Sequence, residues 1–266
     1  MNTKEYLREI GVENFPARTT PFDPGYDAHT LIHHLRQSSH LMSGMKISMA
    51  CWQIANEEVT KEKIRACKDH GVKTCAGGGP LEVAAFFQKL PQYLDLCAHV
   101  GLDCIEAGEG FLRNCLSPKE IVDMAADRGL EVQFELGEKH TGEFDDETVD
   151  ALLRQGEVWL EAGAKQLVIE ARESASGVGL FSNEGTLNEQ LAKRFMECFG
   201  TENTIYEAPV KRSQFALLNY FGPSVRLGNV RLEELLRVEI YRRGLHSDAF
   251  ARENLRPSGP GLVEVA

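Results

Sequence analysis

The chain has little of what marks nucleic-acid-binding, secreted or membrane proteins. Its formal net charge is −11, and its basic residues are mostly interspersed with acidic ones, so no concentrated basic surface is available for nucleic acid. No apolar run is long enough to span a membrane, and no N-terminal apolar stretch has the length of a signal peptide. Its seven cysteines form no Cys-x-x-Cys pair. These absences predict a cytoplasmic protein with buried, reduced thiols and with neither a nucleic-acid nor a membrane partner.

What the sequence does contain is a regular alternation of short apolar runs with segments of helical periodicity. Eight such runs alternate with eight predicted helices, and several of these helices stop at a glycine, as at Gly71, Gly129 and Gly163. Alternation of this kind predicts a parallel sheet, and a count of eight favours closure. We therefore predict an α/β fold, a single-domain (β/α)8 TIM barrel over residues 17–250, with an amphipathic lead-in over 1–16 and a loose tail over 251–266.

Four of the predicted strands end in the same way, with an apolar run that reaches a glutamate and then a small residue or turn. These glutamates are Glu106, Glu135, Glu170 and Glu207. In a barrel the carboxyl ends of the strands meet at one mouth. Clustered carboxylates cannot easily stay ionised together without a cation, and oxygen ligands suit Mg²⁺. The glutamates can instead pair with Lys46, Arg172 or Lys211, and both arrangements stay open.

The cations at the predicted strand ends indicate an anionic substrate. Lys46, Arg172 and Lys211 are placed there, and an arginine adds the two-pronged geometry that suits phosphate or carboxylate. A run of three glycines before a predicted helix exposes backbone N–H groups that can cradle a phosphate, or it forms a plain tight turn. The remaining candidates for substrate binding are Asp23, Gly77, Gly78, Gly79 and Asn229. His140 is the one histidine that the pattern places near the mouth.

Longer motifs resemble the phosphosulfolactate synthase family of coenzyme M biosynthesis. The resemblance runs from about Phe22 to Phe250. Its most specific parts are IEARES with GVGLF and NEG (169–185), IYEAPVKRSQ (205–214), RLGNV (226–230) and YRRGLHSDAF (241–250). Weaker matches are FDPG, MKIS, AGGG, IEAG and FELGEKH. The combination is much more specific than any single motif.

The resemblance implies a (β/α)8 barrel that adds sulfite to phosphoenolpyruvate with Mg²⁺, giving (2R)-phospho-3-sulfolactate, as a carbon–sulfur lyase. It implies Lys139 as the acid that protonates C2 after sulfite attacks C3. It also implies catalytic roles for Glu170, Lys46 and Arg172, with Lys46, Arg172 and Lys211 holding phosphate and carboxylate. The metal would be held, directly or through neighbours, by Glu106, Glu135, Glu170 and Glu207. We also expect that the chain can form a homo-oligomer.

Departures from the family pattern surround the expected pocket. The family usually has Phe-Gly-Trp-Gly after the second strand's lysine, where this chain has Ile47-Ser48-Met49-Ala50. One of the two lysines expected after the fifth strand is Glu138 here, and the fourth strand ends in Glu-Ala-Gly-Glu-Gly rather than Ser-Asp-Gly. Two alternatives therefore stay open. One is a related barrel lyase that uses another enolate-forming phosphorylated acid or another nucleophile, and the other is a non-enzymatic relative of the heat-stress type.

Overall fold

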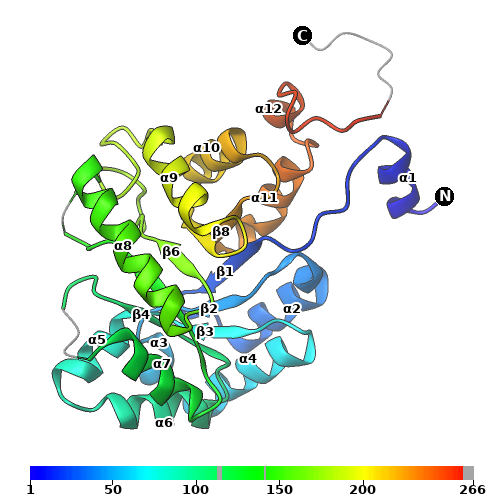
Figure 1. The fold of residues 1–266 in the computed structure, drawn as a ribbon. Helices are drawn as coiled ribbons and strands as arrows, with labels where there is room; N and C mark the ends of the chain where they lie inside the picture. The colour runs from blue at the N-terminus through cyan, green and yellow to red at the C-terminus, as the bar shows by residue number, and fades with distance from the viewer. Residues whose placement is uncertain (113–115, 141, 260–266) are drawn as a thin grey trace.

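The computed structural model describes residues 1–112, 116–140 and 142–259. Eight parallel strands form a closed barrel in the order β1-β2-β3-β4-β5-β6-β7-β8 (Figure 1). The strands are β1 (Thr19–Asp23), β2 (Met45–Ile47), β3 (Thr74–Ala76), β4 (Cys104–Gly108), β5 (Glu131–Leu136), β6 (Leu167–Ile169), β7 (Thr204–Glu207) and β8 (Arg226–Arg231). The predicted fold class is confirmed.

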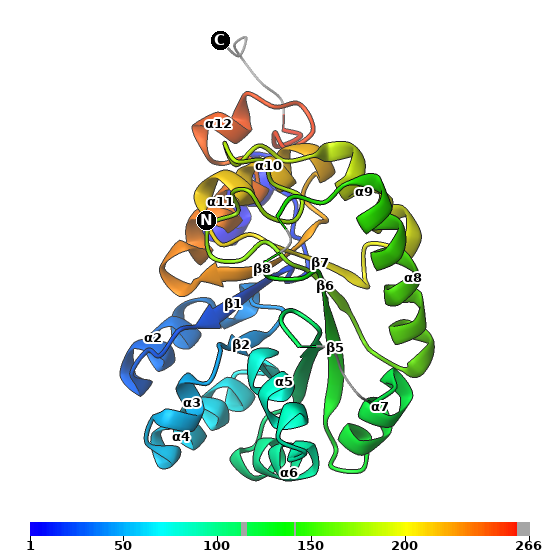
Figure 2. The same cartoon turned by 90° about the vertical axis from the view of Figure 1, so that its left-hand side faces the viewer.

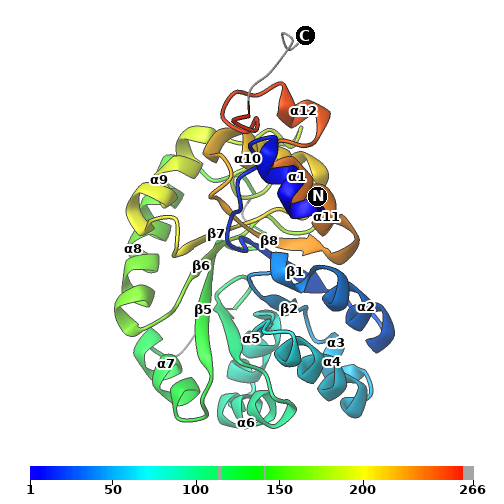
Figure 3. The same cartoon turned by 90° about the vertical axis from the view of Figure 1, so that its right-hand side faces the viewer.

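A helix follows each strand and returns the chain to the start of the next. These helices are α2 (Ala28–Ser38), α4 (Glu57–Asp69), α6 (Leu90–Val100), α7 (Pro118–Ala126), α8 (Asp146–Ala162), α9 (Glu189–Phe199), α10 (Lys211–Phe221) and α11 (Leu235–Arg242). Figures 2 and 3 view the ring of helices from its two sides. Short additional elements are α1 (Thr3–Glu9), α3 (Cys51–Ile54), α5 (Gly79–Phe86), α12 (Ser247–Phe250) and the 3₁₀ turns η1 (Ser39–Leu41) and η2 (Leu232–Glu234).

Local sequence signals set the helix ends. Ser117 and Glu120 form a capping box at the start of α7, in which each side chain accepts the other residue's backbone N–H. Asp27 caps α2 by accepting the N–H of Thr30. Gly101 and Gly163 end α6 and α8 in the left-handed conformation that glycine adopts without steric cost. The sequence predicts a helical segment from about Leu81 to Gly101 that is interrupted at Pro91. The structure has two helices there, α5 and α6, and Pro91 lies in the first turn of α6.

Alternation along the strands separates the core from the mouth. Phe134 of β5 faces outward and stacks on Trp159 of α8 with 4.1 Å between ring centroids. Tyr206 of β7 likewise stacks on Phe221 of α10. The next residue of each strand, Glu135 or Glu207, therefore faces the barrel axis. The apolar layer between strands and helices thus fixes the direction in which these acids point.

The cysteines agree only in part with the expected buried thiols. Cys67, Cys75, Cys97 and Cys104 are buried free thiols, whereas Cys51 is half-buried and Cys198 is exposed; Cys115 lies outside the described residues. The predicted loose tail also lies partly outside them, but its Ser258 donates a backbone hydrogen bond to the Gly11 carbonyl. Among the described residues, no helix combines the length and apolar character that crossing a membrane requires.

Candidate active site

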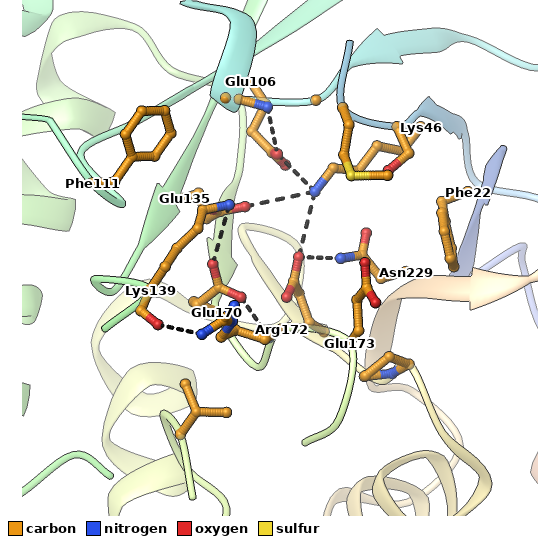
Figure 4. A pocket seen from close by; sticks show the side chains of 18 of the residues that line it. Phe22, Lys46, Glu106, Phe111, Glu135, Lys139, Glu170, Arg172, Glu173 and Asn229 are labelled. Atoms are coloured by element: carbon orange, nitrogen blue, oxygen red, sulfur yellow. Dashed lines mark hydrogen bonds and ion pairs between the residues drawn. The ribbon is translucent and has the colours of Figure 1, made fainter. Parts of the chain in front are cut away.

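A cavity of about 950 Å³ opens at the carboxyl ends of the strands (Figure 4). Every strand contributes to its lining, either from its last residues or from the residue that follows it. In strand order these residues are Phe22, Lys46, Gly77, Glu106, Glu135, Glu170, Glu207 and Asn229. The four glutamates that the sequence singled out thus converge in one place, together with Lys46.

Lys46 lies at the centre of this group. Its Nζ is 2.7 Å from Glu106 Oε1, 3.6 Å from Glu135 Oε2 and 3.4 Å from Glu207 Oε1 (Figure 4). Burial alone would lower the pKa of this lysine, but the three carboxylates outweigh burial and raise the pKa well above its ordinary value. Lys46 therefore stays charged and neutralises part of the acidic cluster.

Two of its partners are held by further hydrogen bonds. Glu106 accepts the Gly78 N–H at 3.1 Å and the side-chain amide of Gln133 at 2.7 Å. Burial raises the pKa of Glu106 to about 7, despite the opposing effect of Lys46. Glu207 accepts the Ala171 N–H at 3.0 Å and the side-chain amide of Asn229. Both glutamates therefore tie neighbouring strand ends together.

Lys139 lies beside the other two glutamates. Its Nζ is 3.3 Å from Glu135 Oε1 and 3.6 Å from Glu170 Oε2. Burial raises the pKa of Glu135, but Lys46 and Lys139 reverse this and bring it to about 2. The pKa of Lys139 is raised, because the carboxylates outweigh its partial burial. Lys139 is thus a charged donor, and 29% of its side chain is exposed.

Glu170 is in the opposite situation. Burial, followed by the charges of Glu207 and Glu135, raises its pKa to about 10, although Lys139 opposes the shift. Its Oε1 accepts the Arg172 N–H at 2.5 Å, whereas its buried Oε2 has no hydrogen-bond partner. At 3.6 Å the attraction of Lys139 is weaker than burial and carboxylate repulsion combined. With these neighbours alone, Glu170 therefore carries a proton at neutral pH.

Three residues that line the cavity, Met49, Arg172 and Asn229, have positive φ angles that residues other than glycine rarely adopt. Arg172 has φ +55° and Asn229 has φ +54°, which costs about 1–3 kcal/mol at each position. In this conformation the Arg172 guanidinium donates to the Lys139 carbonyl at 2.9 Å, and Asn229 reaches Glu207. The strained backbone therefore serves to orient polar groups in the cavity.

Two predicted substrate-binding residues do not line the cavity. The Asp23 carboxylate is buried and accepts from Lys63 Nζ at 2.5 Å and from the backbone N–H groups of Gly25 and Tyr26. The Lys211 side chain extends over the Phe215 ring, with 5.1 Å between Nζ and the ring centroid. The structure therefore does not support direct substrate contact for Asp23 or Lys211. Asp23 instead anchors the loop after β1, and Lys211 lies in the solvated first turn of α10.

The three glycines do line the cavity, but their backbone is partly used within the barrel. Gly77 N–H donates to the Ile47 carbonyl and Gly78 N–H donates to Glu106. A Cβ at Gly77 would lie 3.0 Å from the Met49 backbone nitrogen, so close packing of β2 and β3 explains this glycine. These two N–H groups are therefore engaged in the structure and do not form a free phosphate cradle.

Sequence reasoning missed several residues that line or support the cavity. Arg231 adds a polar group, and Met49 and Phe111 add apolar ones; His140, which the sequence pattern places near the mouth, lines the cavity as well. Of these, Arg231 could have been found, because it lies two residues beyond Asn229 and so faces the same way along a strand. Gln133 could have been found by the same period of two from Glu135. Met49 and Phe111 lie in loops, where no periodicity applies.

Comparison with known proteins identifies the family. The model of the (2R)-phospho-3-sulfolactate synthase (ComA) family matches residues 17–248. A phosphosulfolactate synthase of Methanocaldococcus jannaschii is 31% identical over 235 residues, covering 88% of this chain and 94% of that protein. The corresponding protein of Bacillus subtilis is 30% identical, covering 71% of this chain and 75% of that protein. The chain belongs to the phosphosulfolactate synthase family. It is therefore an enzyme, as the motifs predict.

Solved structures of other proteins share the fold. The carboxyl transferase domain of Rhizobium etli pyruvate carboxylase, determined with 3-hydroxypyruvate, superposes with a TM-score of 0.60 at 10% identity, covering 97% of this chain and 48% of that chain. A fructose bisphosphate aldolase homologue from Coccidioides immitis gives a TM-score of 0.52 at 14% identity, covering 90% and 81%. At these identities the likeness concerns the barrel alone. Inferences about chemistry therefore rest on the family assignment and on the carboxylates and lysines at the strand ends.

Proposed function

We propose that this chain is a phosphosulfolactate synthase that adds sulfite to phosphoenolpyruvate with the help of Mg²⁺, giving (2R)-phospho-3-sulfolactate for coenzyme M biosynthesis in the cytoplasm. The family assignment supports the reaction class. The observation that carries the proposal is the pair of lysines, Lys46 and Lys139, held among four glutamates at the barrel mouth. Such a site can bind a small anion and supply a proton to it. Whether the enzyme works as a homo-oligomer stays a prediction.

In the proposed reaction the lone pair of sulfite forms a bond to C3 of phosphoenolpyruvate. The π electrons of the C2–C3 bond move toward the carboxylate, and C2 then takes a proton. Lys139 is the proton donor, because its charged Nζ is partly exposed in the cavity between Glu135 and Glu170. Proton transfer from a positioned acid contributes about 10²–10⁴ in rate. The product leaves with the new C–S bond and the phosphate ester intact.

The anionic groups of the substrate would meet the cations of the cavity. Arg172 and Arg231 line the cavity and present guanidinium groups suited to phosphate or carboxylate. Lys46 is 7% exposed and surrounded by three carboxylates, so its charge acts mainly by lowering the negative potential of the cavity floor. We therefore assign anion binding to Arg172 and Arg231, with Lys46 in a supporting role.

The donor set fits Mg²⁺, although the four glutamates do not form a ready-made metal cluster. Among the described residues, no group of three or more His, Cys, Asp or Glu side chains is arranged to hold a metal ion. Mg²⁺ usually needs only one or two carboxylates, with substrate oxygens and water completing its coordination. Glu170, whose buried Oε2 lacks a hydrogen bond, is the best candidate, with Glu135 beside it. A bound metal would stabilise negative charge on the substrate carboxylate.

A second candidate function has its own observation. Met49 and Ala50, which replace the residues that the family pattern leads us to expect after Lys46, line the cavity. These substitutions leave the glutamates, lysines and arginines of the cavity in place but change the shape of the substrate that the cavity accepts. A related lyase would use the same enolate chemistry on another phosphorylated acid, or with another nucleophile.

The consumption of sulfite distinguishes the synthase from the related lyase. Purified protein should consume sulfite only when phosphoenolpyruvate and Mg²⁺ are both present, and chelation with EDTA should stop it. Arg172→Lys is a matched variant that keeps the charge and loses the two-pronged geometry, so it should raise KM for phosphoenolpyruvate. Binding of phosphoenolpyruvate without sulfite consumption would reject the synthase in favour of the related lyase.

A further inference from the structure

A buried acid outside the cavity bears on the position of Lys139. Glu82 lies on α5, is 1% exposed, and does not line the cavity. A buried carboxylate is costly unless hydrogen bonds satisfy it. Burial does raise the pKa of Glu82, and backbone N–H groups oppose that shift. These backbone N–H groups therefore favour the charged form of the buried carboxylate.

They belong to the loop that follows β4. Glu82 Oε2 accepts the Phe111 N–H at 3.0 Å and the Leu112 N–H at 2.8 Å. The Gly110 N–H also stabilises the charged form of Glu82. One carboxylate on α5 thus anchors three consecutive residues of a loop that contributes Phe111 to the cavity wall (Figure 4).

The anchored loop contacts Lys139 directly. The Lys139 backbone N–H donates to the Gly110 carbonyl at 2.8 Å. A Cβ built on Gly110 would lie 2.7 Å from Lys139 Cε and 3.1 Å from its Cγ, so the lysine side chain runs closely against this glycine. Figure 4 shows Phe111 and Lys139 along the same side of the cavity. The position of Gly110 therefore sets the path of the side chain that ends between Glu135 and Glu170.

We propose that Glu82 is a positioning residue for Lys139, acting through the loop at Gly110 and Phe111. Its role is to hold the Lys139 ammonium at its present distance from Glu135 and Glu170. The catalytic consequence rests on the proposed function, in which Lys139 protonates C2, whereas the positional consequence does not. A displacement of about 1 Å at a reacting group can cost about 10²-fold in rate.

Two substitutions at Glu82 test this by turnover. Glu82→Met keeps the approximate volume and removes both acceptor oxygens, so kcat should fall about 100-fold while KM for phosphoenolpyruvate stays within about threefold. Glu82→Gln keeps one acceptor oxygen for the Phe111 and Leu112 N–H groups and should recover most of kcat. Asp103→Leu is the matched control, because Asp103 accepts the Thr74 backbone N–H at the opposite end of the barrel. It should lower stability and leave kcat unchanged.

A measurement that needs no turnover separates this proposal from the proposed function. Reductive methylation followed by peptide mass spectrometry reports how fast Lys139 reacts in the folded protein. Lys139 should react faster in Glu82→Met than in the wild type, while Lys73, an exposed lysine paired with Glu131, reacts equally in both. Gly110→Ala, which pushes directly on the lysine side chain, should have the same effect even if Glu82→Met folds poorly.

Equal methylation rates for Lys139 in the wild type, Glu82→Met and Gly110→Ala would overturn the proposal. So would a loss of kcat in Glu82→Met that Asp103→Leu matches, because that would show a general loss of stability. A wild-type protein without synthase activity, but with the predicted methylation pattern, would instead reject the proposed function and keep Glu82 as the residue that positions Lys139.

Discussion

At the scale of residues, the chemistry of this barrel depends on four glutamates that differ in charge because their neighbours differ. Glu135 lies near two lysines and has a pKa of about 2, whereas Glu170 is buried beside two carboxylates, with Lys139 opposing them, and has a pKa of about 10. One glutamate is thus a permanent anion, and another holds a proton until a cation or substrate changes its surroundings. Pairs of acids driven apart in this way are typical of active sites.

The raised pKa of Glu170 predicts a specific dependence of stability on pH. The pKa of this carboxyl group rises from 4.5 in the unfolded chain to about 10 in the folded protein. The protonated group therefore contributes its full stabilisation below pH 4.5, and this contribution is lost as the pH rises from 4.5 to about 10. Glu170→Gln mimics the protonated acid and avoids the loss. Without metal at pH 7, the variant should therefore be more stable to unfolding by about 3 kcal/mol, with a difference that shrinks toward pH 4.

Thermal or urea unfolding of Glu170→Gln beside the wild type checks this. The same variant should be inactive, because an amide replaces the best candidate ligand of the metal. A variant that keeps full activity would show that Glu170 is not part of the reacting site. The charge assignment would be contradicted if the stability gain of the variant over the wild type were smaller at pH 7 than at pH 4.

Lys139 gives a second prediction at this scale. Lys139→Met removes the proposed proton donor and leaves Arg172 in place, so kcat should fall about 10²–10⁴-fold while phosphoenolpyruvate binding changes little. Steady-state kinetics and direct binding of phosphoenolpyruvate separate the two effects. A variant that loses binding and keeps kcat at saturation would move Lys139 from proton transfer to anion binding.

Lys46 gives a third prediction at the scale of residues. Lys46→Met would leave Glu106, Glu135 and Glu207 buried without their shared cation, and breaking a buried ion pair on one side costs about 3–5 kcal/mol. The loss should be large at pH 8 and smaller at pH 5, where Glu106, with a pKa of about 7, takes up a proton. Chemical denaturation at both pH values measures it, and a loss independent of pH would contradict the role of Lys46 as a shared counter-ion.

At the scale of elements, the helix ends predict effects on stability that leave catalysis intact. Gly163 ends α8 at φ +111°, and a Cβ there would lie 3.2 Å from Val122 of α7. Gly163→Ala should therefore cost about 1 kcal/mol or more of unfolding free energy, since alanine rarely adopts this conformation. Its kcat should equal that of the wild type, because the residue lies at the opposite end of the strand from the cavity. A kcat well below the wild-type value would contradict this separation.

The elements are also where sequence reasoning succeeds best. The order of strands and helices, the capping box at Ser117 and the glycine stops follow from short-range periodicity and backbone preference, which the sequence displays directly. The convergence of Glu106, Glu135, Glu170 and Glu207 followed from the same periodicity, because strand ends in a barrel must meet. The short α3 was missed, since it depends on loop contacts rather than on a repeating pattern, whereas the division between α5 and α6 was indicated only as an interruption at Pro91.

Side-chain pairings could not be predicted in the same way. Asp23 ends β1 and Lys211 begins the helix after β7, yet Asp23 binds Lys63 of α4 and Lys211 lies over Phe215. The choice between cavity and scaffold depends on the partner that lies nearest in three dimensions, and Lys63 is 40 residues away in sequence. The support of Lys139 by Glu82 was invisible for the same reason, because it passes through a loop backbone.

At the scale of the whole molecule, closure of the barrel is what brings the site together. β8 pairs with β1, and below that junction Thr19, Glu239 and Arg242 form a buried hydrogen-bonded network. Closure places the ends of β4 to β7 opposite β2, so that Lys46 reaches three acids from strands that are distant in sequence. The acidic net charge of −11 does not prevent the binding of an anion, because Lys46, Lys139, Arg172 and Arg231 line the cavity beside its glutamates.

The proposed addition of sulfite to phosphoenolpyruvate is tested most directly by ³¹P NMR. Purified protein would be incubated with phosphoenolpyruvate, sulfite and Mg²⁺, with EDTA in one control and Lys139→Met in another. The account predicts a new phosphate-ester resonance that requires all three reactants, disappears with EDTA and forms at least 100-fold more slowly with the variant. An unchanged phosphoenolpyruvate spectrum with folded wild-type protein, or equal product from Lys139→Met, would contradict it.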